Sequence, residues 1–173
     1  MKSVQNEVFD VVNERDEVVG RESRSEVHRL GLKHRAIHVL LTNSPGEVFL
    51  QKRSSTKDTW PRAWDSSVSG HLDAGEDYYE AARREVREEL GWELTEPLTR
   101  IFKIDACEET GQEFVWVYRG EAEGPFNLHP EEIESGRWFS VSEVEALIGD
   151  PTVKDAASFR YIWSLVKGLG FFS

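Results

Sequence analysis

The amino-acid sequence predicts an α/β fold in which a mixed β-sheet is flanked by helices. Apolar and β-branched runs come in pairs around turn-forming residues, segments of helical periodicity lie between them, and the two kinds of segment are interleaved along the chain. The 173 residues are enough to bury a core, and no repeat, low-complexity segment or linker divides them. We therefore expect one domain spanning residues 1–173.

The expected elements follow from local patterns. Strands are expected where short runs are rich in apolar and β-branched residues, at 7–12, 18–22, 35–42, 47–52, 98–108, 112–121 and 134–139. Helices are expected where apolar residues recur every three or four positions, at 25–30, between Asp77 and Gly91, at 142–148 with Ser142 as cap, and at 155–169 after Pro151. The turn at residues 43–46 predicts a hairpin between strands 35–42 and 47–52, and residues 54–69 are expected to be a loop.

The helix between Asp77 and Gly91 carries the most informative pattern. Glu85, Glu88 and Glu89 are spaced i, i+3 and i+4, which places three carboxylates on one helical face. Like charges at this spacing repel, whereas a hard divalent cation such as Mg²⁺ prefers oxygen ligands and removes the penalty. The spacing is therefore compatible with a metal site, and a solvated surface helix with ion pairs is the alternative.

The same stretch matches a longer signature. Residues 70–92 read GHLDAGEDYYEAARREVREELGW: a glycine, five residues, Glu, seven residues, and then Arg-Glu-apolar-any-Glu-Glu-any-Gly-apolar, with Trp92 in the last apolar place. A surface helix with ion pairs such as Arg84–Glu88 does not explain this register. The segment resembles the signature of the Nudix hydrolases. The resemblance implies an α/β/α sandwich and cleavage of a diphosphate linkage with Mg²⁺, or with Mn²⁺ as a substitute.

The resemblance also implies roles for the charged residues of the signature. Glu88 and Glu89 correspond to metal ligands, and Glu85 to either the base that takes a proton from water or a ligand of a second metal. Arg84 would hold Glu85 by an ion pair. Glu76 would be a weaker ligand or a group behind the ligands.

Three further residues are candidates outside the signature. Many Nudix hydrolases take an additional glutamate from a loop before a late strand, and Glu132 is the best match, with a solvated acidic loop as the alternative. Arg53 and Lys57 are candidate phosphate contacts, with an exposed basic pair as the alternative for each.

Residues outside the signature resemble the isopentenyl diphosphate isomerase-like branch of the family. The shared features are His34, Trp60-Pro61, Trp64 and Gly70-His71. True isomerases carry a catalytic cysteine where this chain has Ser69, and a hydroxyl is a far weaker acid than a thiol. We therefore interpret the chain as a hydrolase on an isomerase-like scaffold. An isomerase is the alternative, and a non-catalytic binding module is a third hypothesis.

The histidines have two interpretations. In the isomerases, histidines near His34 and His71 help to bind a divalent metal, and His28 is displaced by one residue from a third such position. Because hard cations prefer oxygen, we interpret His34 and His71 as structural groups or substrate contacts.

Composition limits the partners. The net charge of −11 argues against binding of a nucleic-acid duplex, and it is compatible with a small phosphorylated substrate. Because no apolar run approaches the ~20 residues of a membrane span and no signal segment is visible, we expect a cytoplasmic protein, as monomer or homodimer.

Nucleoside di- or triphosphates rank first as substrates, with Trp60, Trp64 or Phe126 as stacking residues. Nucleotide sugars, dinucleoside polyphosphates and prenyl diphosphates stay open.

Overall fold

The computed structural model describes residues 7–172 and contains a seven-stranded mixed sheet. Strand β3 (His34–Thr42) lies at its centre and pairs in parallel with β8 (Glu113–Glu121) along its whole length. Strand β7 (Thr99–Ile104) runs antiparallel to β8, and β6 (Val68–His71) runs antiparallel to β3 on the other side. Strand β4 (Val48–Arg53) joins β9 (Ile133–Phe139) and the short β5 (Trp64–Asp65).

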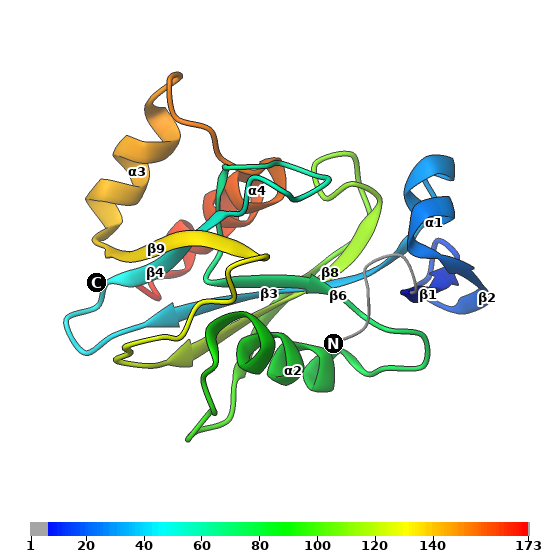
Figure 1. The fold of residues 1–173 in the computed structure, drawn as a ribbon, viewed down its shortest axis with the longest axis horizontal. Coiled ribbons are helices and arrows are strands. Elements are labelled where there is room, and N and C mark those ends of the chain that lie inside the picture. Colours follow the sequence, from blue (N-terminus) through cyan, green and yellow to red (C-terminus); the bar gives the residue numbers. More distant parts are fainter. Residues whose placement is uncertain (1–6, 173) are drawn as a thin grey trace.

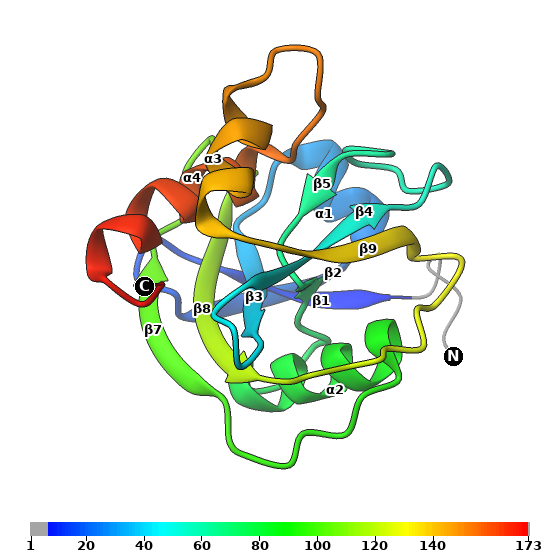
Figure 2. The same ribbon diagram turned by 90° about the vertical axis from the view of Figure 1, so that its left-hand side faces the viewer.

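Helices cover both faces of this sheet. Figure 2 shows α2 (Tyr78–Leu90) on one side, and α3 (Val141–Gly149) and α4 (Ala157–Val166) on the other. A short 3₁₀ turn, Lys167–Leu169, follows α4. The antiparallel pair β1 (Val8–Val12) and β2 (Val18–Ser23) packs with α1 (Arg24–Leu30) at one end of the molecule (Figure 1). The expected α/β/α arrangement with a mixed sheet is confirmed.

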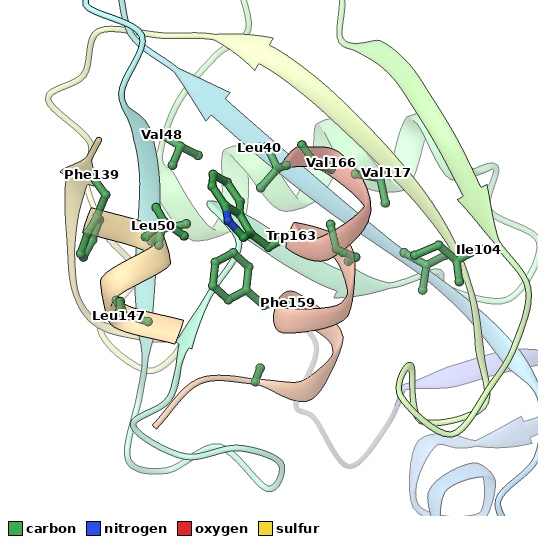
Figure 3. Packing of buried hydrophobic residues seen from close by; sticks show 14 of the residues in the cluster. Leu40, Val48, Leu50, Ile104, Val117, Phe139, Leu147, Phe159, Trp163 and Val166 are labelled. Atoms are coloured by element: carbon green, nitrogen blue, oxygen red, sulfur yellow. The ribbon is translucent and has the colours of Figure 1, made fainter. Parts of the chain in front are cut away.

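Two apolar cores lie on opposite faces of the sheet, which explains why β3 is buried along nearly all of its length. Under α4, Phe159 and Trp163 point toward Leu40 and Leu50 of the sheet (Figure 3). Under α2, the stripe Ala82, Val86 and Leu90 is completely buried, as its spacing predicts. Helix α2 is therefore fixed by its apolar face, and its acidic face is left to line a cavity. None of the helices in residues 7–172 is long and apolar enough to cross a membrane.

The ends of α2 are set by the two residues named from the sequence. Asp77 accepts hydrogen bonds from the backbone N–H groups of Tyr79 and Glu80, and Gly91 closes the helix in the left-handed conformation at φ 58°. A Cβ atom on Gly91 would also lie 3.0 Å from Cβ of Asn127, so glycine is favoured there by space as well as by backbone angle.

The expected hairpin between β3 and β4 is present but short. The two strands pair antiparallel at Thr42 and Val48 and then diverge, because β6 takes the place beside β3 and β9 pairs with β4. One expectation was wrong: the segment 54–69 is not a continuous loop, since it contains β5 and the start of β6. These two short strands have little apolar alternation, so their pairing depends on distant partners and leaves no local signal.

Two helix starts also differ from the sequence-based prediction. Helix α3 is capped by Ser140, not Ser142, and Glu143 completes a capping box with it. Helix α4 begins at Ala157, later than expected, because Asp155 is held in a parallel bridge to Trp64 and cannot adopt helical geometry.

Candidate functional site

A cavity of about 1080 Å³ opens between the acidic face of α2, the loop after β4 and the loop before β9. Its other wall is made by α1, the start of β3 and the end of β6. The cavity therefore collects side chains from segments that are far apart in the sequence. The sequence-predicted residues that line it are Arg53, Lys57, His34, His71, Arg84, Glu85, Glu88, Glu89 and Glu132.

The three glutamates of α2 differ in their environments. Glu89 is only 4% exposed, the Glu85 side chain is 14% exposed, and the Glu88 side chain is 47% exposed. A Cβ atom on Gly70 would lie 2.5 Å from Oε1 of Glu85, closer than real contacts of this kind. The first glycine of the signature therefore leaves room for the Glu85 carboxylate, which any side chain at position 70 would force to move.

Arg84 organises this acidic face. Its guanidinium donates to Glu85 at 2.7 Å and to Glu88 at 3.2 Å. It also donates to the two carboxylate oxygens of Glu76, at 2.8 Å each, and to the backbone carbonyl of His71 at 3.0 Å. The ion pair that the sequence suggested between Arg84 and Glu85 is present in the structure.

Glu76 is turned away from the cavity. Both its oxygens contact Arg84, and one also accepts the backbone N–H of Asp73 at 3.0 Å. Among residues 7–172, Glu76 is not one of those that line the large cavity. This position suits a group behind the ligands and not a ligand itself.

Burial changes the protonation of the two inner glutamates. It raises the pKa of Glu85 to about 7, although Arg84 partly offsets the effect. Burial also raises the pKa of Glu89 well above its ordinary value, and the neighbouring charge of Glu85 adds to this. When no cation is bound, these two buried carboxylates resist ionisation. A hard divalent ion prefers oxygen ligands, and its charge would favour their ionised form. The donor set of the acidic face therefore fits Mg²⁺ or Mn²⁺.

Gln51 holds Glu89 in place. Its side-chain amide donates to Oε2 of Glu89 at 2.9 Å, and Gln51 itself is 1% exposed on β4. The sequence analysis missed this residue. The available signal was a polar side chain at the end of an otherwise apolar run, Val-Phe-Leu-Gln.

The basic candidates also line the cavity and are largely buried, so the alternative of an exposed surface pair is wrong. Only 11% of the Arg53 side chain and 17% of the Lys57 side chain are exposed. Lys57 forms an ion pair with Glu132, whose own side chain is 27% exposed. Glu132 is therefore brought to the site and is not part of a solvated acidic loop.

Of the three aromatic residues considered for stacking, only Trp60 lines the cavity, and it is 45% exposed. Trp64 packs edge-on against Phe139. Phe126 packs in the core between Phe49, Trp92 and Trp138. A base could therefore be reached by Trp60 but not by the other two.

A second group of metal-binding side chains faces the same cavity. His28 of α1, His34 at the start of β3, His71 at the end of β6 and Glu113 at the start of β8 each offer one ligand atom, and these atoms all lie within 4.8 Å of one another. Glu113 Oε1 lies 2.8 Å from Nε2 of His71 and 3.4 Å from Nε2 of His34. Glu113 was missed because its proximity to His34 follows from the parallel register of β3 and β8.

Two histidines of this group, His28 and His71, are in the form that can bind a metal. Burial lowers the pKa of His71 to about 4 and lowers the pKa of His28, so both rings are neutral near pH 7. Burial alone would raise the pKa of Glu113, but His71 and His34 outweigh it and hold that pKa well below its ordinary value. Nδ1 of His34 lies 2.9 Å from the carbonyl of Leu32, and its buried Nε2 has no hydrogen-bond partner among residues 7–172. Three imidazoles and a carboxylate suit a transition metal.

Ser69 of β6 also lines the cavity. Its hydroxyl donates to Asp65 at 3.2 Å, and the same Asp65 oxygen accepts from Arg53 at 3.1 Å. His38 is paired across the sheet with Ser69 and is hydrogen-bonded to Ser66 at 2.8 Å. The position of the isomerase cysteine is thus occupied by a hydroxyl that is engaged with a buried carboxylate.

Comparison with known proteins places the chain in a family. Residues 32–160 match the model of the NUDIX domain. A Nudix hydrolase of Deinococcus radiodurans is 35% identical over 149 residues, which covers 86% of this chain and 87% of that protein. An uncharacterised Nudix hydrolase of Yersinia pestis is 34% identical over 160 residues, covering 91% and 85%. The crystal structure of DR0079 from Deinococcus radiodurans has a TM-score of 0.81 and 32% identity, covering 94% of this chain and 98% of the other. The chain therefore belongs to the Nudix family and is a Nudix hydrolase.

Proposed function

We propose that the protein hydrolyses a diphosphate linkage in a nucleoside di- or triphosphate, or in a related nucleoside diphosphate derivative. The observation that carries the proposal is the acidic face of Glu85, Glu88 and Glu89 on the wall of a large cavity. The basic side chains of Arg53 and Lys57 line the same cavity and supply positive charge for phosphate groups.

The chain's own residues divide the work as follows. Glu88 and Glu89 would hold a divalent cation, with Glu132 as an additional ligand, and Gln51 would fix the orientation of Glu89. Bound Mg²⁺ or Mn²⁺ supplies charge neutralisation of the phosphates and a lower pKa for water. Because burial raises the pKa of Glu85 to about 7, this carboxylate is suited to accept a proton from the attacking water near neutral pH.

The nucleoside part of the substrate is proposed on two observations. Trp60 is exposed at the cavity and offers an aromatic face for stacking on a base. The volume of about 1080 Å³ is at the upper end of the range for small-molecule sites, so the cavity has room for both a nucleoside and its phosphates.

A screen for release of phosphate or pyrophosphate tests the proposal. Nucleoside di- and triphosphates, nucleotide sugars and dinucleoside polyphosphates would each be incubated with the protein and Mg²⁺ or Mn²⁺. We expect turnover of at least one nucleotide and its loss in Glu89→Gln. Glu80→Gln, on the exposed face of the same helix, is the matched control and should retain turnover. Absence of turnover across the panel would contradict the proposal.

The second candidate is an isomerase, and the group formed by His28, His34, His71 and Glu113 is the observation that favours it. This group supports the resemblance to the isopentenyl diphosphate isomerase-like branch. Against it stands Ser69, since a hydroxyl cannot readily exchange a proton at an isolated alkene. We expect no conversion of isopentenyl to dimethylallyl diphosphate, and conversion by protein purified free of host enzyme would reverse the ranking.

A further inference from the structure

Lys57, in the loop after β4, and Glu132, in the loop before β9, both line the cavity of the acidic site. Their side chains form an ion pair, with 17% of the lysine and 27% of the glutamate side chain exposed. The loops that carry them are joined separately by the backbone: Ser54 N–H donates to the carbonyl of Glu132 at 2.9 Å, and the Thr56 hydroxyl donates to the carbonyl of Glu131 at 3.3 Å. The two side chains therefore stay opposite each other even when the ion pair is broken.

Arg53 and Lys57, the two candidate phosphate contacts, differ in how firmly they are held. The Arg53 guanidinium donates to Asp65 at 3.1 Å and to the carbonyl and hydroxyl of Thr59 at 3.1 and 3.4 Å, so its position is fixed. Within residues 7–172, Glu132 is the hydrogen-bond partner of the Lys57 ammonium. An ammonium on a flexible four-carbon stem can reorient, and an ion pair that is partly exposed contributes little stability. Lys57 is therefore the cation that can move.

Glu132 lines the same cavity as Glu85, Glu88 and Glu89 of α2. The loop before β9 is also tied to the end of that helix, because His129 N–H donates to the carbonyl of Glu89 at 2.9 Å and Glu132 N–H donates to the carbonyl of His129 at 3.0 Å. Lys57 thus supplies positive charge at the place where the additional ligand of a divalent cation would lie.

We propose that Lys57 is an exchangeable counter-cation: it neutralises Glu132 when no divalent cation is bound, and it is displaced when the cation takes Glu132. The displaced ammonium then contacts the diphosphate of the substrate. This inference rests on the proposed function, in which Glu132 is a metal ligand. Exchange is favoured because a divalent cation on Glu132 would repel the neighbouring ammonium, and because the ammonium neutralises the negative charge that attracts the cation.

The exchange predicts that replacing Lys57 strengthens the binding of metal and weakens the binding of substrate. Lys57→Met removes the competitor without changing the length of the side chain greatly. We expect Mn²⁺ to bind roughly fivefold more tightly to the variant when no substrate is present. The reason is that Glu132 no longer has to break its ion pair with Lys57 before it can bind the metal. Titration followed by the electron paramagnetic resonance signal of free Mn²⁺ measures this on the full chain. The KM of the nucleotide identified above should rise.

Lys52→Met is the matched control. Lys52 lies on β4 and forms an ion pair with Glu134 at 3.4 Å, but it is not among the described residues that line the cavity. Its replacement by methionine changes the net charge by the same amount as Lys57→Met. Its Mn²⁺ affinity should equal that of the unmodified protein. Lys57→Arg keeps the charge and can pair with both oxygens of Glu132, so it should bind Mn²⁺ no more tightly than the unmodified protein.

A double-mutant cycle separates direct exchange from a general effect of charge. In a Glu132→Gln background, Lys57→Met should leave Mn²⁺ affinity unchanged, because the competition is for Glu132. The same tightening in both backgrounds, or no tightening in Lys57→Met, would overturn the exchange while leaving the hydrolase proposal in place. Failure of the unmodified protein to bind Mn²⁺ would overturn the metal mechanism and this inference together.

Discussion

Replacing Glu85 with glutamine should stabilise the metal-free protein, and the gain should depend on pH. Burial raises the pKa of Glu85 from its ordinary 4.5 to about 7 in the folded state. Below pH 4.5 the group is protonated in both the folded and the unfolded chain, so it costs nothing. Between the two values the unfolded chain releases the proton and the folded chain keeps it, so stability falls as pH rises. Above about 7 the cost is constant.

The magnitude follows from the two pKa values. The interval from 4.5 to about 7 corresponds to about 3 kcal/mol, at about 1.36 kcal/mol for each pH unit. Less than half of this cost has developed near pH 5.5, so about 2 kcal/mol should appear between pH 5.5 and pH 8. Glutamine keeps an oxygen that can accept the hydrogen bond from Arg84, which lies 2.7 Å from Glu85.

Urea unfolding in EDTA at about pH 5.5 and about pH 8 measures this difference. The quantity to compare is the free energy of unfolding of Glu85→Gln minus that of the unmodified protein, which removes the contributions of the buried histidines. It should increase toward pH 8, whereas Glu80→Gln on the exposed face of α2 should show no increase. If this difference in unfolding free energy is the same at the two pH values, the pKa of Glu85 is not raised and the reasoning is refuted. Added Mg²⁺ should stabilise the unmodified protein more than the variant.

Further predictions concern the site and the core. Gly70→Ala should lower turnover at least tenfold while the chain stays folded, because the new Cβ would meet the Glu85 carboxylate; unchanged kcat would contradict this. Hydrolysis should vanish in excess EDTA and rise with pH through about 7 as Glu85 ionises, and a profile that falls over this range would exclude Glu85 as the base. Glu132→Gln should reduce turnover less than Glu89→Gln, and equal loss would give Glu132 a primary role. Trp163→Ala, at a site 2% exposed, should cost about 3–5 kcal/mol in urea unfolding, and a cost below about 1 kcal/mol would contradict its place in the core.

The sequence by itself determined the helix that carries the acidic site. Glu85, Glu88 and Glu89 lie on one face because helical geometry fixes the direction of side chains three and four residues apart. Asp77 and Gly91 mark the ends of the helix for equally local reasons, since a carboxylate satisfies free N–H groups and glycine tolerates the left-handed conformation. The α/β class followed from the order of apolar runs. None of these inferences needed to know which strands are neighbours.

Only the tertiary structure decided which distant residues complete the site. Glu113 reaches the histidines because β8 runs parallel to β3 in one particular register, and Gln51 reaches Glu89 because β4 passes beside the signature helix. The pairing of Lys57 with Glu132 joins two loops that are 75 residues apart. Long-range register depends on the packing of the whole sheet between two layers of helices, and a one-residue slip of β8 or β4 would turn Glu113 or Gln51 to the opposite face. No local sequence pattern indicates which register the strands adopt.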